Sequence, residues 1–287
     1  MSLYIFLFLC LFLFLCWTSW HPKYHVLRLS LIHDPPPFIN PNQRLPNIVF
    51  RTSKTRMLPP SMFEAYQSMD WMPQWLMNRE ECRELIVNHF PPEYVKAYDT
   101  VIPGAYKADL WRLCVLYMYG GFYMDISLCC VAPFPEHWLT SYECILVEDD
   151  WKKGIYNAFM AFEKGHFLLR WWLEDIVDRI LRHDYGRDAL DITGPQRLAS
   201  VFREKFLRGQ KYHYGDNTIH GMRFLMLWHK KKRRIYDHPR SPTLLLYGHP
   251  DYDKERSRIH TRYYGTMWKQ RTVFVPSSSN VDKIPSQ

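Results

Sequence analysis

Five polar residues near the middle of the chain have types and spacings that could carry chemistry. They are Lys107, Asp109, Arg112, Asp125 and Ser127. Asp109 and Arg112 are three residues apart, so on a helix they would share one face. A guanidinium binds phosphate oxygens through two parallel hydrogen bonds, and a carboxylate at the end of a strand can bind a hard divalent cation or a sugar hydroxyl. Together these groups would suit a diphosphate attached to a sugar.

Two plainer interpretations fit the same residues. An Asp and an Arg at this spacing often form a surface ion pair that contributes little to stability. A single Asp after a strand is often a turn-forming residue. The spacing by itself leaves all three interpretations open.

A helix and a strand must position these side chains. The segment "AYKADLWRLCVLYMY" has apolar residues at helical spacing, and the Gly120-Gly121 pair that follows is typical of a helix C-terminus. The next residues, "FYMDI", are the aromatic and apolar types that favour a strand. This strand would deliver Asp125 to its carboxyl end, which is the edge where open α/β sheets bind ligands.

The rest of the chain alternates between predicted strands and helices, which indicates an α/β fold in one large domain. Further strands are predicted at Ile48–Phe50 and within residues 144–150 and 241–248. Further helices are predicted over residues 61–77, over 79–90 and over most of 155–181.

The segment "YKADLWRLCVLYMYGGFYMDIS" resembles the sugar-binding region of family 32 glycosyltransferases. These are enzymes of the α-mannosyltransferase and α-galactosyltransferase type, and the large clostridial glucosylating toxins carry a related segment. The family pattern is an Asp, an Arg three residues later, a Gly-Gly pair and an Asp-x-Asp motif. The residues that match it in type and spacing are Asp109, Arg112, Gly120, Gly121 and Asp125.

Four further segments resemble elements of the same family, in the family's order. They are "LPNIVFRTSKTRMLP", "IYNAFMAFEKGHFLLRWW", "DITGPQRL" and "RYYGTMWKQ". An Asp-x-Asp motif alone would be a weak signal. Five elements in order over residues 45–270 form a much more specific one.

The resemblance implies a GT-A fold, in which helices flank a Rossmann-like mixed sheet. It also implies a UDP- or GDP-hexose donor, a glycan, glycolipid or protein acceptor, Mn²⁺ or Mg²⁺ as cofactor, and retention of anomeric configuration. The residues expected to be catalytic are Asp109, Arg112, Asp125 and Asn157, and Asp125 and Ser127 are expected to hold the metal. The residues expected to bind substrate are Thr52, Lys107, Asp149, Gly194, Pro195 and Trp268.

The chain departs from the family pattern at two places. Ser127 stands where the family has the second Asp of its motif, and a hydroxyl is a far weaker ligand for a hard cation than a carboxylate. Tyr263 and Met267 stand near the His and Ser expected in the closing loop. We therefore predict a hexosyltransferase with a weakened metal site. The alternative is a non-catalytic relative that keeps the fold as a binding or scaffold protein.

Residues 1–20 carry no charged side chain and are long enough to span a bilayer. We interpret them as an uncleaved transmembrane signal anchor, because they lack the basic start and the small-residue cleavage site of a signal peptide, which is the rival interpretation. A proline-rich stem would follow over residues 21–44, then the GT-A domain over 45–275 and a disordered tail over 276–287.

The orientation of the anchor stays open. The resemblance favours a Golgi or endoplasmic reticulum membrane with a lumenal catalytic domain. Lys23 and Arg28 follow the span, however, and basic residues next to a span favour the cytoplasmic side.

The net charge of +8 includes five positive charges in one run, Lys230–Arg234. The plain interpretation of this run is a solvated loop, and the alternative is a surface that binds anions or a membrane. No other basic stripe and no recognition motif accompanies it, so we expect no nucleic-acid partner. The seven cysteines include no CxxC pair, which argues against a zinc site.

Overall fold

The computed structural model describes residues 25–26, 42–149, 153–230, 233–240, 243–258 and 263–276. The predicted anchor at residues 1–20, most of the predicted stem and residues 277–287 of the predicted tail lie outside these ranges. Among the helices that the structure describes, none is long and apolar enough to cross a membrane.

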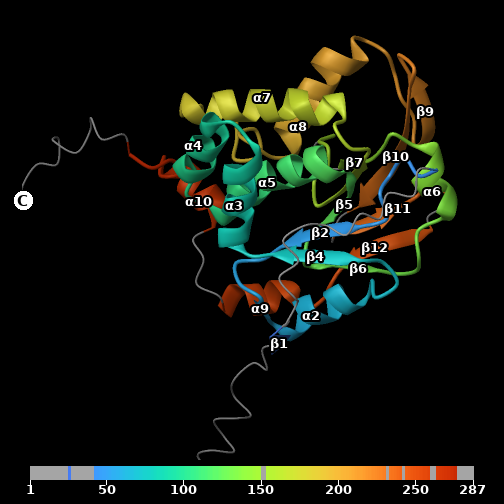
Figure 1. The fold of residues 1–287 in the computed structure, drawn as a ribbon, viewed down its shortest axis with the longest axis horizontal. Coiled ribbons are helices and arrows are strands. Elements are labelled where there is room, and N and C mark those ends of the chain that lie inside the picture. Colours follow the sequence, from blue (N-terminus) through green and yellow to red (C-terminus); the bar gives the residue numbers. More distant parts are fainter. Residues whose placement is uncertain are drawn as a thin grey trace, which may run out of the picture.

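A mixed β-sheet forms the centre of the described structure (Figure 1). Its strands run in the order β4-β2-β5-β8-β7-β10-β11-β12-β6, and β9 pairs with β10. Strand β2 is parallel to both β4 and β5, and β7 is parallel to β10, whereas the other neighbours are antiparallel. The strands are β2 (Val49–Thr52), β4 (Gln74–Met77), β5 (Gly121–Met124), β6 (Leu128–Cys130), β7 (Cys144–Asp149), β8 (Phe159–Phe162), β9 (Gly215–Ile219), β10 (Met222–Lys230), β11 (Arg234–Tyr236) and β12 (Leu244–Gly248).

The sheet curls, because β6 follows β5 closely in the chain yet pairs with β12 at the far end of the strand order. A separate pair of two-residue strands joins β1 (His25–Val26) to β3 (Met57–Leu58), so this part of the predicted stem lies against the domain. The mixed sheet with flanking helices confirms the predicted α/β class and is consistent with a GT-A fold.

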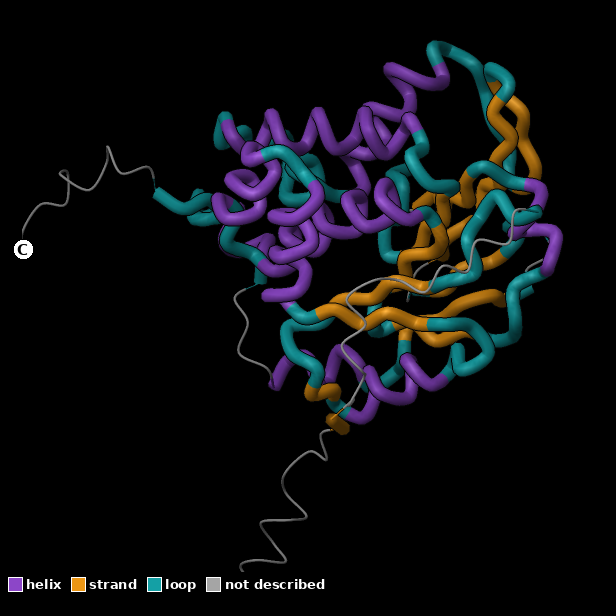
Figure 2. Tube along the Cα trace, in the orientation of Figure 1, coloured by secondary structure: helices purple, strands orange, loops and turns teal. Residues whose placement is uncertain are grey.

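Helices lie on both sides of the sheet (Figure 2). The larger group, α3, α4, α5, α7, α8 and α10, lies on one side, and α2 and α9 lie on the other (Figure 1). The helices are α2 (Pro60–Gln67), α3 (Arg79–His89), α4 (Pro92–Thr100), α5 (Gly104–Tyr119), α6 (Glu136–Ser141), α7 (Phe167–Leu181), α8 (Pro195–Val201), α9 (Tyr252–Arg258) and α10 (Tyr264–Lys269), with a π-helical turn η1 (Phe202–Leu207) after α8.

Alternating side chains of the central strands fill two cores. Phe50 and Tyr123 are buried in the core beneath α3, α5 and α7. Their neighbours Val49 and Phe122 are buried in the core on the other face. Because successive strand residues point to opposite faces, strands buried on both faces consist almost entirely of apolar residues.

Two predicted helices are wrong in part, since each also contains a strand. Within residues 61–77, helix α2 ends at Gln67 and β4 follows, parallel to β2. Within residues 155–181, β8 comes first and lies antiparallel between β5 and β7, and α7 begins only at Phe167. Both strands are short apolar runs, and the adjoining strands of the sheet decide their conformation. The other predicted strands and helices are confirmed to within a few residues.

Gly120 and Gly121 join α5 to β5 in a space that a larger residue would not fit. Both have positive φ, 68° and 89°. A Cβ on Gly120 would lie 2.7 Å from the Lys164 backbone nitrogen, and one on Gly121 would lie 2.8 Å from the Ile48 side chain. The glycine pair therefore lets β5 enter the sheet directly beside β2, and Asp125 follows at its end.

Candidate active site

Asp109 and Arg112 form a buried ion pair on α5. Arg112 Nη2 lies 3.0 Å from Asp109 Oδ1, and the two side chains are only 6% and 11% exposed. The interpretation of this pair as a surface ion pair is therefore wrong. A buried pair of this kind requires further hydrogen bonds to offset the loss of hydration of both charges.

Asp109 receives such bonds from two distant segments. Asn157 Nδ2 donates to Oδ1 at 3.0 Å, and Thr193 Oγ1 donates to Oδ2 at 2.6 Å. Burial raises the pKa of Asp109 to about 6, against the opposing effects of Arg112 and of these two donors. The carboxyl group is thus ionised at neutral pH and has a partner at each oxygen.

Arg112 is surrounded in the same way. Its Nη1 donates to the Asn157 backbone oxygen, and its guanidinium carbon lies 4.3 Å from the centre of the Tyr123 ring. Nη1 also lies 3.7 Å from Asp125 Oδ1. Because Arg112 is buried and already engaged by these partners, it is suited to hold Asp109 and Asp125 in position.

Asp125 follows β5 directly, and its side chain is 38% exposed. Its Oδ1 accepts a hydrogen bond of 2.7 Å from the Tyr123 hydroxyl. Burial raises the pKa of Tyr123 well above its usual value, so this hydroxyl keeps its proton and acts as the donor. The exposed part of the Asp125 carboxylate is held in a defined position at the strand end, where the sequence predicted a ligand contact.

The residues at this strand end fit a divalent cation poorly. The Asp-x-Asp motif of the family supplies two carboxylates, whereas this chain has Asp125 and the neutral hydroxyl of Ser127, which is 4% exposed. One oxygen of Asp125 is already bonded to Tyr123, and the positive charge of Arg112 lies nearby. Hard cations prefer several charged oxygen ligands, and this donor set offers one.

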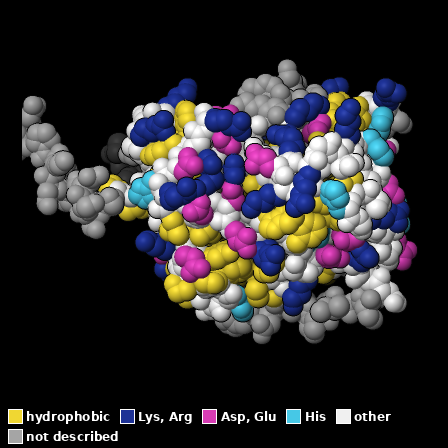
Figure 3. Space-filling model, turned by 90° about the horizontal axis from the view of Figure 1, so that it is seen from above, with side chains coloured by type: hydrophobic (Ala, Val, Ile, Leu, Met, Phe, Trp, Pro, Cys, Tyr) yellow, Lys and Arg dark blue, Asp and Glu magenta, His cyan; other side chains and the backbone are white. Residues whose placement is uncertain are grey.

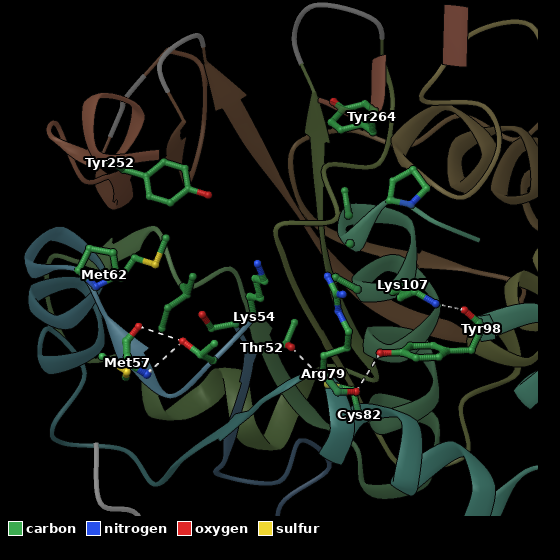
Figure 4. Close-up of a pocket in the computed structure, with 18 residues that line it drawn as sticks. Thr52, Lys54, Met57, Met62, Arg79, Cys82, Tyr98, Lys107, Tyr252 and Tyr264 are labelled. Carbon is green, nitrogen blue, oxygen red and sulfur yellow. Dashed lines mark hydrogen bonds between the residues drawn. The ribbon is translucent and has the colours of Figure 1, made fainter. Parts of the chain in front are cut away.

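A cavity of about 480 Å³ opens beside this strand end (Figure 4). Its walls come from the end of β2, the start of α3, the start of α5 and one residue each of α9 and α10. Ile126, the neighbour of Asp125, also lines it. The lining residues are Thr52, Ser53, Lys54, Thr55, Met57, Pro59, Met62, Arg79, Cys82, Tyr98, Pro103, Gly104, Ala105, Lys107, Ala108, Ile126, Tyr252 and Tyr264.

Of the predicted substrate-binding residues, Thr52 and Lys107 line this cavity. Thr52 Oγ1 donates to the Met77 backbone oxygen at 2.9 Å, so its hydroxyl proton is engaged within the sheet. Lys107 Nζ donates to the Tyr98 backbone oxygen and lies 4.5 Å from the centre of the Tyr98 ring. Burial lowers the pKa of Lys107 to about 8.

Asp149 and Trp268 are not among the residues that line the cavity. Asp149 Oδ1 lies 3.1 Å from His229 Nδ1, and the His229 ring stacks on Tyr156 at 3.9 Å. Trp268 Nε1 donates to the Tyr185 backbone oxygen at 2.7 Å, and on the same helix it is Tyr264 that faces the cavity.

Gly194 and Pro195 shape the backbone behind the ion pair. The Pro195 backbone oxygen accepts a hydrogen bond of 3.0 Å from the Ile155 N–H, two residues before Asn157. A Cβ on Gly194 would lie 3.1 Å from the Leu190 oxygen. In this segment it is the side chain of the preceding residue, Thr193, that contacts Asp109.

A separate group of potential metal ligands lies at the opposite edge of the sheet. Oxygen or nitrogen atoms of Glu143, Glu163 and His166 lie within 4.8 Å of one another. His166 Nδ1 accepts a hydrogen bond from the Leu168 N–H, so in the neutral ring the proton is on Nε2. A protonated Nε2 is a hydrogen-bond donor, and the group is therefore poorly suited to a metal ion.

The sequence reasoning did not select four residues of the site. Thr193 belongs to the "DITGPQRL" segment and Tyr123 to the "FYMDI" strand, so both lay within segments already singled out. Lys54 lies four residues after the end of the first predicted strand, and Arg79 begins a predicted helix. Lys54 and Arg79 could have been found because each is a basic residue close to the end of a predicted strand or the start of a predicted helix, where ligands often bind.

Comparison with known proteins confirms the family resemblance. Residues 15–145 match the family described as "Glycosyltransferase sugar-binding region containing DXD motif". This span includes β2, α5, β5 and Asp125, which border or lie next to the cavity. Over these residues the chain is thus similar to the sugar-binding region of DXD glycosyltransferases.

Two curated relatives share parts of the sequence. The chain is 30% identical over 153 residues to inositol phosphoceramide mannosyltransferase 3 of Schizosaccharomyces pombe, a match that covers 52% of this chain and 42% of the relative. It is 36% identical over 53 residues to an uncharacterized glycosyltransferase, L373, of Acanthamoeba polyphaga mimivirus, covering 18% and 21%. The chain therefore spans less than half the length of each of these relatives.

Among solved structures, the chain is similar to one described as PaToxG glycosyltransferase. The TM-score is 0.40 at 12% sequence identity, and the match covers 56% of this chain and 70% of that chain.

Proposed function

We propose that the protein transfers a hexose from a nucleotide-sugar donor, and that the donor binds in the cavity between β2, α3 and the start of α5. The observation that carries this proposal is the place of Asp125. Its partly exposed carboxylate lies at the end of β5, and its neighbour Ile126 lines the cavity. The family match supports the proposal, since the matched span contains these same elements.

Asp125 acts in this proposal on the sugar of the donor. Its free oxygen accepts a hydrogen bond from a sugar hydroxyl, and its charge stabilises the positive character that develops at the anomeric carbon. As the bond from that carbon to the donor phosphate breaks, the oxygen of the acceptor hydroxyl forms the new bond, and its proton passes to the departing diphosphate, which takes the bonding electrons. Retention of configuration is proposed from the resemblance.

Asp109, Arg112, Asn157 and Thr193 act as positioning residues. Their mutual hydrogen bonds hold α5, the segment after β7 and the start of α8 together beneath the cavity. Arg112 in turn faces both Asp125 and its partner Tyr123. Fixing these groups before substrate arrives lowers the cost of organising the site during the reaction.

The donor is a UDP- or GDP-hexose, and the acceptor is a glycan, glycolipid or protein. The name of the yeast relative, an inositol phosphoceramide mannosyltransferase, supports mannose as the sugar and a glycolipid as the acceptor. We also propose that residues 1–20 anchor the chain in a Golgi or endoplasmic reticulum membrane, with the catalytic domain in the lumen.

The test is hydrolysis of the donor in the absence of acceptor. The chain is incubated with a panel of UDP- and GDP-hexoses, with and without Mn²⁺, and released nucleoside diphosphate is measured. One donor should be consumed faster than the others, and Asp125→Asn should slow its hydrolysis at least tenfold. Asp70→Asn is the matched control, because Asp70 is an exposed acid that does not line the cavity. A folded chain that hydrolyses none of the donors would contradict the proposal.

Ser127 favours a second candidate, a non-catalytic protein that binds the donor without turnover. This candidate predicts that the unchanged chain binds nucleotides but does not hydrolyse nucleotide sugars. Restoring the second acid with Ser127→Asp should then produce hydrolysis that depends on Mn²⁺. Equal hydrolysis by both proteins would exclude it.

A further inference from the structure

The donor site has fewer acidic groups and more basic groups than a metal-dependent site requires. Asp125 is the one acid at positions 125 and 127, and it already accepts a hydrogen bond from Tyr123. By contrast, three basic residues line the cavity, Lys54, Arg79 and Lys107. Among the described lining residues none is acidic. This imbalance favours an anionic ligand that is neutralised by protein side chains.

We propose that Lys54 and Arg79, together with Lys107, bind the phosphates of the donor directly, so that donor binding does not require a divalent cation. This inference rests on the proposed function, because it assigns the groups that hold the donor in the same cavity. It also assigns a different role to Arg112, which is occupied by partners beneath the surface.

Lys54 and Arg79 are available for a ligand. Both side chains are exposed, and neither forms a hydrogen bond or an ion pair with any residue that the structure describes. Figure 4 shows them extending in the same direction, towards the space between Tyr252 and Tyr264. Positive charges that line the same cavity repel each other, and an anion bound between them removes that repulsion.

The positions of Arg79 and Lys107 in their helices increase the positive potential of the cavity. Arg79 is the first residue of α3, and Lys107 lies in the first turns of α5. A positive charge at a helix N-terminus interacts unfavourably with the helix dipole. A bound anion would remove this unfavourable interaction for both residues. The first turn of α3 also contains Glu80 and Glu81, and Glu81 is engaged by Arg56 and by a capping box with Asn78.

The start of α5 adds backbone donors to the same wall. No side chain caps this helix, whose N-cap is Pro103, and Gly104 and Ala105 of its first turn line the cavity. The first N–H groups of a helix have no partner within it and favour phosphate. A Cβ added to Gly104 would lie 3.4 Å from Arg79 Nη2, so the guanidinium lies close to this helix start.

The test measures binding of UDP, GDP and inorganic pyrophosphate to the full chain by calorimetry. Each titration is done with Mn²⁺ and again with excess EDTA. For at least one of the three ligands, removal of metal should change the affinity by less than about threefold. Because a charge-assisted hydrogen bond is strong, Arg79→Gln and Lys54→Gln should each weaken binding roughly tenfold or more, with or without metal.

Arg83→Gln is the matched control. Arg83 lies one turn further along α3, is paired with Asp99 and does not line the cavity. The variant changes the net charge of the protein by the same amount as Arg79→Gln. It should bind like the unchanged chain. Thermal unfolding checks that each variant is folded, which we expect because the substituted side chains are exposed.

The outcomes separate this inference from the proposed function. Binding that disappears in EDTA, or that Arg79→Gln leaves unchanged, overturns direct phosphate binding, and donor hydrolysis can still be present. Metal-independent binding that is lost in Arg79→Gln, without hydrolysis of any nucleotide sugar, supports direct phosphate binding and contradicts the transferase. Equal weakening by Arg79→Gln and Arg83→Gln means that general charge attracts the ligand, and this also overturns the inference.

Discussion

At the scale of single residues, the site consists of side chains that face the cavity and side chains that hold them in place. Lys54, Arg79 and Lys107 are of the first kind, Asp109, Asn157 and Thr193 are of the second, and Asp125 lies at the strand end next to the cavity-lining Ile126. A charge as buried as that of Asp109 is stable only when partners replace the lost water. The predictions at this scale therefore concern Thr193, a buried hydrogen-bond donor, and Lys107, a basic residue that lines the cavity.

Thr193→Val should destabilise the fold by removing the hydrogen bond to Asp109. A bond to a charged group contributes about 1.5–3 kcal/mol, and we expect a loss of that order in the free energy of unfolding. The variant should also raise the pKa of Asp109 further above its value of about 6. A carboxyl group with a raised pKa in the folded state stabilises most at low pH and loses that contribution as the pH rises through the folded pKa. Urea unfolding should thus show a larger loss at pH 8 than at pH 5.

Thr193→Ser keeps the hydroxyl and is the control for this prediction. It should lose less stability than Thr193→Val at pH 8. Equal losses would show that the methyl group, and not the hydrogen bond, makes the contribution.

Lys107 should make phosphate binding depend on pH. Burial lowers its pKa to about 8, Asp99 opposes this, and Arg79 and Arg83 lower the pKa further. The other group that faces it is Tyr98, whose backbone oxygen and ring it contacts. A bound anion favours the protonated amine, so binding should be accompanied by proton uptake and should weaken as the pH rises above 8. Calorimetry with pyrophosphate between pH 6.5 and 9.5 measures this.

In Lys107→Gln the weakening between pH 8 and pH 9.5 should be absent, and binding should be weaker at lower pH. The same pH profile in both proteins would assign the titration to another group.

At the scale of elements, the connection between α5 and β5 determines where the site forms. The helix carries Asp109 and Arg112, the strand delivers Asp125, and Gly120 and Gly121 set the angle between them. Positive φ is unfavourable for residues with a Cβ, and at this connection the surrounding backbone leaves no space for one either.

Gly121→Ala should destabilise the protein more than Gly209→Ala. Both glycines have φ near 90°, and strain at such a position costs about 1–3 kcal/mol. A Cβ on Gly121 would also overlap the Ile48 side chain, whereas a Cβ on Gly209 would have no atom within 4 Å apart from its own chain neighbours. Denaturant unfolding of the two variants therefore separates the conformational cost from the steric one. Equal losses would mean that the sheet accommodates the methyl group.

At the scale of the whole molecule, one sheet brings distant segments to a common edge. On the face seen in Figure 3, Lys and Arg side chains are interspersed with Asp and Glu. In the described part of the basic run, Lys230 ends β10 and Arg234 begins β11, while Arg233 pairs with Asp253. This arrangement favours the interpretation of the run as a solvated hairpin end.

Membrane attachment is the prediction that belongs to the whole chain. If residues 1–20 form an anchor, the full chain should remain with membranes through a carbonate wash, and a chain without residues 1–22 should be released. N-terminal sequencing of the membrane-bound protein is the control. A mature chain that begins beyond Trp20 would indicate a cleaved signal peptide instead.

The sequence alone determined the local frame of the site. Helical spacing placed Asp109 and Arg112 on one face, the glycine pair ended the helix, and aromatic residues predicted the strand before Asp125. Each of these features depends on residues within a turn or two of one another, so the local pattern is sufficient. The exception is the short apolar run, as in β4 and β8, whose conformation depends on the strands that flank it.

The tertiary structure decided which side chains face the ligand. Asn157 and Thr193 reach Asp109 across 48 and 84 residues of chain, and Lys54, Arg79 and Lys107 line one cavity from a loop and two helices. The strand order brings these groups together, because neighbours in the sheet are far apart in the sequence. Burial followed from the same packing, and it excluded the interpretation of Asp109 and Arg112 as a surface ion pair.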